Sequence, residues 1–256
     1  MNIINRQITN KLLSWSMFFV FLGSGVTVEA VTLETIVRKG QRSPDGNGKF
    51  SDFHCPAIND AGQVAFWAKL TDTRAGNKDN QGIFRVRDGK VTRIVRKGQQ
   101  PPEGNGRFLD LSCPLLNSAG QVAFRAKLAG TRGKNKDNIG IYRGGGGALT
   151  QIARKGQRSP DGNGRLSDLS GPVLNDAGQV AFWAKLTGTS GGSKDNEGVY
   201  RGRSATLTQI MREGQMPVPD DIEYYEDAYI SDPALNSSGQ VAFSIFRKVS
   251  PSLGVG

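Results

Sequence analysis

Apolar residues alternate with polar ones over short stretches that return at a fixed interval along the chain. In the first full copy, this pattern predicts four strands, at 50–58, 63–70, 82–87 and 91–95. The segment between the first two strands, Asn59-Asp60-Ala61-Gly62, is typical of a tight turn, because Asn and Asp hydrogen-bond to nearby backbone and Gly accepts positive φ. Each copy is therefore predicted to be an antiparallel meander of about four strands.

The copies are regular in length. The tetrapeptide Arg38-Lys39-Gly40-Gln41 returns 58 residues later at 96–99, again at 154–157, and with Glu in place of Lys at 212–215. Three units have this length, and the fourth has three additional residues before Pro233. Four copies in phase indicate a repeat architecture, in which each unit buries its apolar surface against its neighbours.

The second strand of each unit is apolar on both faces. Val64, Phe66 and Ala68 point to one side of the first copy, and Ala65 and Trp67 point to the other. A strand that is buried on both sides needs a sheet above and below it, as in radially packed blades. We therefore predict an all-β fold, a β-propeller-like tandem repeat of about four blades of antiparallel strands. A β-solenoid is the alternative.

The two ends of the repeat region complement each other. Segment 32–37 matches the fourth strand of a unit, and 240–246 matches the second strand. The N-terminal strand is therefore expected to complete the last blade and to cover an edge that would invite aggregation. The expected assembly is a monomer or a dimer that completes the ring. The units are assigned to 32–91, 92–149, 150–206 and 207–247, in a repeat domain over 31–247 that precedes a short tail, 248–256.

The first thirty residues have the organisation of an export signal. Arg6 and Lys11 form a basic head, 12–22 is mostly apolar, and the segment ends in Val28-Glu29-Ala30. This order is typical of a cleaved secretory signal peptide, and the apolar run is shorter than the ~20 residues that span a bilayer. We expect residues 1–30 to be removed. The mature protein would then be secreted, periplasmic or at the cell surface, without a membrane span.

Composition restricts the chemistry further. The 256 residues include 34 Gly, which agrees with many turns, and the formal net charge is +10. Two Cys and a single His, His54, exclude a zinc site of four Cys or of paired Cys and His, and a His-based triad without His54. Cys55 and Cys113 occupy matching positions on neighbouring units. Export permits a disulfide, but such positions are expected to exceed the ~7 Å Cα separation that a disulfide tolerates, so free thiols are expected.

The motif Asn-x-x-Gly-x-x-Ala-Phe carries a family resemblance. Its four copies begin at Asn59, Asn117, Asn175 and Asn236. The region from Thr32 to Phe246 resembles exported bacterial tandem-repeat proteins that are defined by this motif and are often attached to the cell surface by a C-terminal sorting anchor. The hairpin has a weaker likeness to the blades of TolB-type propellers. The resemblance implies export and a repeat fold, and it implies no known reaction.

Two sets of residues are candidates for ligand binding. In a closed ring the recurring Arg-Lys pairs would form a circle of positive charge that attracts an acidic polysaccharide or another envelope component; alternatively, they only keep an outer strand soluble. These residues are Arg38, Lys39, Arg96, Lys97, Arg154, Lys155 and Arg212. The atypical fourth unit adds Tyr224, Tyr225 and Tyr229, which could stack on sugar rings or belong to a capping segment. Nucleic acid is not an expected partner.

Asp52, Asp110 and Asp168 also recur in phase. Such carboxylates could cleave glycosides, but a residue repeated in every blade is more typical of the blade's own hydrogen bonding, because catalysis needs unlike groups. Segment 44–48 is expected to be a turn and not a calcium loop. We therefore expect an exported, non-enzymatic binding or structural protein without a cofactor or metal. The alternative is a carbohydrate-active propeller hydrolase or lyase.

Overall fold

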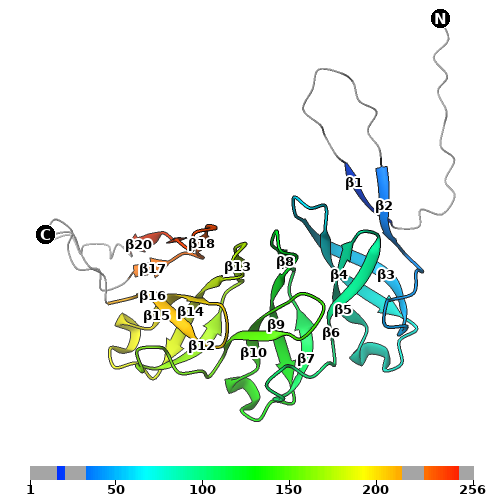
Figure 1. The fold of residues 1–256 in the computed structure, drawn as a ribbon. Coiled ribbons are helices and arrows are strands. Elements are labelled where there is room, and N and C mark those ends of the chain that lie inside the picture. Colours follow the sequence, from blue (N-terminus) through cyan, green and yellow to red (C-terminus); the bar gives the residue numbers. More distant parts are fainter. Residues whose placement is uncertain (1–15, 21–32, 215–227, 248–256) are drawn as a thin grey trace, which may run out of the picture.

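The computed structural model describes residues 16–20, 33–214 and 228–247, which form a series of antiparallel sheets (Figure 1). The all-β prediction is confirmed. The first sheet contains, in spatial order, β3 (Lys49–Ile58), β4 (Val64–Thr71), β5 (Gln81–Arg87) and β6 (Lys90–Arg96). The four strands predicted for this unit are confirmed, and their ends agree to within one residue.

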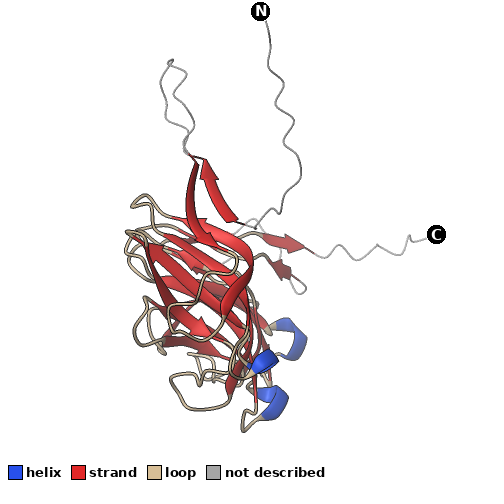
Figure 2. Ribbon diagram, turned by 90° about the vertical axis from the view of Figure 1, so that its right-hand side faces the viewer, coloured by secondary structure: helices blue, strands red, loops and turns tan. Residues whose placement is uncertain are grey.

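The next two units repeat this meander. The second contains β7 (Arg107–Leu111), β8 (Leu115–Leu116), β9 (Val122–Ala129), β10 (Ile139–Gly144) and β11 (Thr150–Arg154). The third contains β12 (Arg165–Leu169), β13 (Val173–Leu174), β14 (Val180–Thr187), β15 (Glu197–Gly202) and β16 (Leu207–Arg212). The 3-10 helices η1 (Gly76–Lys78), η2 (Lys134–Lys136) and η3 (Gly192–Lys194) follow the second strand of each unit and gather at one end of the sheets (Figure 2).

Shorter strands form the two ends of the series. β1 (Ser16–Val20) pairs with β2 (Leu33–Arg38). In the fourth unit, β17 (Ala228–Ile230) pairs with β20 (Ile245–Arg247), and β18 (Ala234–Leu235) pairs with β19 (Val241–Ala242). Except for 16–20, the predicted signal segment 1–30 lies outside the described residues, as does the tail 248–256. Within the part of the chain that is described, no helix has the length and apolar character needed to cross a membrane.

The hydrophobic core lies between successive sheets. We call the face of each sheet that packs on the preceding unit its front, and the opposite face its rear. Ile83 and Val95 on the rear of the first sheet pack in one cluster with Phe108, Phe124 and Tyr142 on the front of the second. The same arrangement joins the second and third sheets. The prediction that the second strand is buried on both faces is confirmed.

The sheets follow one another along an arc, with β1 and β2 at one end and β17 to β20 at the other (Figure 1). β2 packs on the front of the first sheet, where Val37 joins the cluster of Phe50 and Phe66. It thus takes the place that the fourth strand of a preceding unit would have. Over 33–214 and 228–247 the arc stays open, and β2 is not paired with a strand of the fourth unit.

The turns between the first and second strands of neighbouring units are joined by asparagine side chains. The Nδ2 of Asn59 donates to the backbone carbonyl of Asn117 at 2.9 Å. Asn117 donates in the same way to Asn175, and Asn175 to Asn236, both also at 2.9 Å. We call Asn59, Asn117, Asn175 and Asn236 the asparagine ladder. Each Oδ1 also accepts the backbone N–H of the Gln four residues later, which fixes the turn.

The glycine of the motif permits the close approach that the ladder requires. Gly120 has φ +75°, and a Cβ there would overlap the side chains of Gln63 and Arg85 from the preceding unit. Arg85 donates to the carbonyl of Gly120, and Arg201 donates to that of Gly239. The turns therefore approach each other to hydrogen-bonding distance, although face-to-face sheets normally lie about 10 Å apart.

This convergence explains why the expectation of free thiols is wrong. Cys55 and Cys113 form a disulfide, with their Cα atoms 5.4 Å apart. Both residues lie only a few positions before the ladder asparagines, where neighbouring units are closest. Equivalent residues of neighbouring sheets are too distant for a disulfide in the middle of the sheets but not beside the turns.

Replacing Asn117 by Ala should lower the free energy of unfolding by about 1–3 kcal/mol, because the buried carbonyl of Asn175 and the N–H of Gln121 lose their partners. Asn236→Ala is the matched control. Asn236 is exposed and is the last rung among the described residues, so its loss should cost less. Urea unfolding at low protein concentration measures both. Equal losses would show that the ladder adds nothing beyond the turn itself.

Reduction of the disulfide should lower the free energy of unfolding by about 2–4 kcal/mol, because it releases a constraint on a long loop in the unfolded chain. The measurement is urea unfolding with and without a thiol reductant. A variant with both Cys55 and Cys113 changed to Ala should have the stability of the reduced parent protein, both with and without the reductant. Titratable thiols in the unreduced, denatured protein would contradict the bridge.

Candidate functional site

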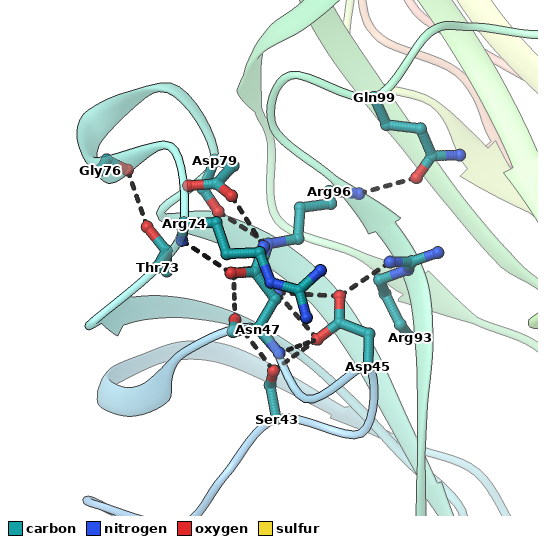
Figure 3. A network of polar contacts seen from close by, with 10 residues as sticks. All are labelled: Ser43, Asp45, Asn47, Thr73, Arg74, Gly76, Asp79, Arg93, Arg96 and Gln99. Atoms are coloured by element: carbon teal, nitrogen blue, oxygen red, sulfur yellow. Dashed lines mark hydrogen bonds and ion pairs between the residues drawn. The ribbon is translucent and has the colours of Figure 1, made fainter.

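A polar network lies at the end of each sheet where the 3-10 helix is found, and Figure 3 shows the network of the first unit. In the first unit, Asn47 donates from Nδ2 to Asp79 Oδ2 at 2.7 Å and accepts the N–H of Arg74 at 2.8 Å. These bonds join the loop before the first strand to the loop after the second. The second and third units repeat them with Asn105 and Asp137, and with Asn163 and Asp195.

The arginine of the recurring tetrapeptide enters this network from the last strand. Arg96 Nε donates to the Asp79 carbonyl at 2.7 Å, and Nη2 donates to the Asn47 carbonyl at 2.6 Å. Nη1 forms an ion pair with Asp45 at 3.0 Å. The equivalent pairs are Arg154 with Glu103 and Arg212 with Asp161.

The predicted circle of exposed positive charge therefore needs correction. Arg96, Arg154 and Arg212 are only 3%, 6% and 1% exposed. Their charges neutralise carboxylates inside each unit, because a buried guanidinium requires a partner. Arg38 and Lys39, which begin the pattern, are exposed, and Lys97 and Lys155 are half-buried.

The ion pair changes the ionisation of Asp45. Burial raises the pKa of this carboxyl group, but hydrogen bonds from Ser43, Arg93 and the Asn47 backbone, together with the charge of Arg96, outweigh burial and lower the pKa to about 2. The pKa of Asp161 is also lowered. These carboxylates are charged at neutral pH, so they act as fixed partners for the arginines and not as proton donors.

The lysines beside the buried arginines line open space. A groove of about 430 Å³ lies between the first and second units, and its walls include Lys78, Lys97 and Arg107. We call these three residues the basic groove. Within the described ranges none of them has an ion-pair partner, whereas the acids of the groove, Asp45 and Asp79, are bonded to Arg96 and Asn47.

Positive charge at this position decreases along the arc. The second junction keeps three cations, Lys136, Lys155 and Arg165, but has Gln151 where Arg93 lines the first groove, and the unit after it has Lys194 followed by Glu213. Glu213 is buried and accepts the N–H of Asn196. The three junctions thus share one backbone arrangement and differ in charge, and the first has the strongest attraction for an anion.

The recurring aspartates have the structural role that the sequence favoured. Asp52, Asp110 and Asp168 stand beside register shifts of the first strand, and each accepts the N–H of the next residue at 2.9–3.0 Å. Asp52 also lies 3.0 Å from His54 Nε2. Asp168 forms an ion pair with Arg125 of the preceding unit at 3.2 Å. None of these contacts brings two of the three carboxylates together.

The predicted tyrosine site of the fourth unit lies mostly outside the described residues. Tyr224 and Tyr225 lie outside the described residues, and Tyr229 lies in β17 opposite Phe246. The predicted turn at 44–48 is confirmed by the hydrogen bond from the Gly46 N–H to the Ser43 carbonyl at 2.9 Å. In the part of the chain that can be described, no three His, Cys, Asp or Glu side chains gather as a metal site would require.

Sequence reasoning missed the acids and amides that hold the buried arginines. The signal was present as the tripeptide Lys-Asp-Asn, which occurs at 78–80, 136–138 and 194–196 with the period of the repeat. Its first copy places Lys78 on the basic groove, and its Asp anchors the network in each unit. In each unit the backbone carbonyl of this Asp accepts the Nε of the buried arginine.

Comparison with known proteins gives a family without a described activity. The model of a family of unknown function, DUF7453, matches residues 22–251. No curated protein matches the chain. The matched region contains the ladder, the buried ion pairs and the basic groove.

Asp45→Asn should destabilise the protein at pH 7 by about 2 kcal/mol or more, because Arg96 stays buried without its counter-charge. The folded-state pKa of Asp45 lies below its unfolded value, so the stabilisation is complete above about pH 4 and is lost as the pH falls towards 2. Urea unfolding of both proteins between pH 7 and pH 2.5 measures the difference.

The control for this prediction is Asp72→Asn. Asp72 pairs with Lys49 at 3.0 Å, but both side chains are about half exposed or more. Exposed pairs contribute roughly 0–1 kcal/mol, so this variant should differ little from the parent. A loss as large as that of Asp45→Asn would mean that burial does not distinguish the two pairs.

Proposed function

The chain belongs to the DUF7453 family, whose description names no activity, and we propose that it is an exported, non-enzymatic protein that binds an anionic polysaccharide. The basic groove is the observation that carries this proposal. Lys78, Lys97 and Arg107 face a groove of about 430 Å³, and the acids beside them are already engaged. The groove therefore presents net positive charge to a ligand.

A polymer suits this arrangement better than a small anion. The groove is open and is lined mainly by polar and charged residues, and the same positions in the next unit again carry Lys136, Lys155 and Arg165. A chain with regularly spaced carboxylates or sulfates contacts both positions at once, and the second contact gains from the effective concentration that the first provides. Binding of this kind weakens as salt screens the charges.

The remaining parts of the proposal concern architecture and location. We propose that the units are blades of a propeller-like arrangement, supported by the burial of each second strand on both faces and by the arc of sheets in Figure 1. Export is supported by the basic, apolar and small-residue order of 1–30. An exported location brings the protein into contact with the acidic polysaccharides of the cell envelope.

Lys97→Glu should weaken binding to heparin and alginate by at least about threefold and lower the salt concentration at which the protein elutes, because it reverses one charge in the basic groove. Lys155→Glu should have a smaller effect, since its junction carries less positive charge. The matched control is Lys90→Glu, an exposed lysine at the turn between β5 and β6. Lys90→Glu changes the net charge by the same amount and should leave the affinity within experimental error of that of the parent protein.

Two results would count against the proposal. Equal shifts for Lys90→Glu and Lys97→Glu would mean that retention follows net charge and not the groove. Turnover in a polysaccharide-cleavage assay that is abolished by Asp168→Ala would favour the carbohydrate-active enzyme instead. The folding of each variant is checked by circular dichroism before binding is compared.

A further inference from the structure

The front of the first unit lacks contacts that every later front has. The ladder glycines Gly120, Gly178 and Gly239 each lie against a Gln and an Arg side chain of the preceding unit. Gly62, at the same position of the first unit, has no heavy atom within 4 Å of the place where a Cβ would be. The first turn is thus built for a neighbour that the described part of this chain does not supply.

A groove marks the place of the missing neighbour. It has a volume of about 290 Å³, and its lining includes Ile36, Ile58 and Ala61. Ile58 is 45% exposed, whereas its counterparts Leu116 and Leu174 are half-buried between units. Ile36 of β2 occupies the position that Ile94 and Ile152 of the fourth strands have at the later junctions. The turn and second strand of a neighbour are therefore enough to fill the groove.

The rear of the fourth unit offers that turn and strand. Asn117 and Asn175 each donate from Nδ2 both to their own Gln and to the next ladder carbonyl, but for Asn236 the described residues provide only the bond to Gln240 Oε1, at 2.7 Å. Asn236 and Gln240 are exposed. The asparagine at this end therefore has one amide proton for a further carbonyl.

The fourth unit also differs from the others in polarity at its rear. Lys69, Lys127 and Lys185 occupy equivalent rear positions of the second strands and are exposed. The fourth unit has Phe246 there, and this ring is 57% exposed. A large exposed aromatic residue in place of a repeated lysine is typical of a contact surface.

We infer that the rear of the fourth unit of one molecule docks on the front of the first unit of a second copy of this chain. Asn236 would donate to the carbonyl of Asn59, and Phe246 would lie at the rim of the contact, because the equivalent Lys69, Lys127 and Lys185 stay exposed at the junctions within the chain. The occupant is a second copy because Asn236 and the turn at Asn59 present the two halves of a turn-to-turn contact that the chain already makes three times. Contacts of this head-to-tail kind extend into a filament, or close into a ring if the rotation permits.

The test uses one blocking variant for each half of the contact. Ala61→Arg fills the front groove, and Phe246→Glu places a charge on the rear. The parent protein should show a mass that rises with concentration in size-exclusion chromatography with light scattering. Each variant alone should associate at least about tenfold more weakly, because a single blocked half stops every contact. An equimolar mixture of the two should recover a dimer, since each variant retains the half that the other lacks.

Ala205→Arg is the matched control, because Ala205 is exposed in a turn of the third unit and its substitution adds the same side chain. It should associate like the parent. A parent that stays monomeric up to its solubility limit overturns the inference. So does a mixture that remains monomeric while both variants have the circular dichroism spectrum of the parent. If the Phe246→Glu variant associates with itself when no Ala61→Arg variant is present, the contact is front to front. This result would also overturn the inference.

Discussion

The fold depends on the requirement that each hairpin turn must find hydrogen-bond partners in the next unit. The side chain of Asn117 fixes its own turn through Gln121 and at the same time reaches the carbonyl of Asn175. Because one residue makes both bonds, the shape of a turn and the position of its neighbour are set together. The arc of Figure 1 follows from this step, repeated along the chain.

Polar groups hold neighbouring units together at the turns, and apolar groups hold them together in the middle of the sheets. At the turns, small residues and hydrogen bonds bring the backbones together. In the middle of the sheets, Phe124 and Tyr142 of one unit need room to pack against Ile83 of another. The units diverge from the ladder because aromatic side chains require more space than asparagine bridges. At the far end, each buried arginine forms an ion pair with an acid of its own unit.

Features that depend on neighbouring residues could be predicted from the sequence, and features that depend on distant contacts could not. The alternation of apolar and polar residues over short stretches predicts the strands of the first unit. The four residues from Asn59 to Gly62 predict the turn. The disulfide required knowledge of how far apart two turns lie. The burial of Arg96 depends on Asp45, which is 51 residues away, and arginine alone gives no sign of it, because the same residue type is usually exposed.

Repetition within one chain separates positions that hold the fold from positions free to acquire a function. The ladder asparagine occurs in four units, and the buried arginine occurs in the three units whose last strand is described; both hold the backbone arrangement. Beside that arginine the residue changes from Lys97 and Lys155 to Glu213, although β6, β11 and β16 all end at the arginine. The rear position changes from Lys185 to Phe246. These side chains concentrate positive charge at the first junction and apolar surface at the last, and the two proposed contacts use this polarity along the arc.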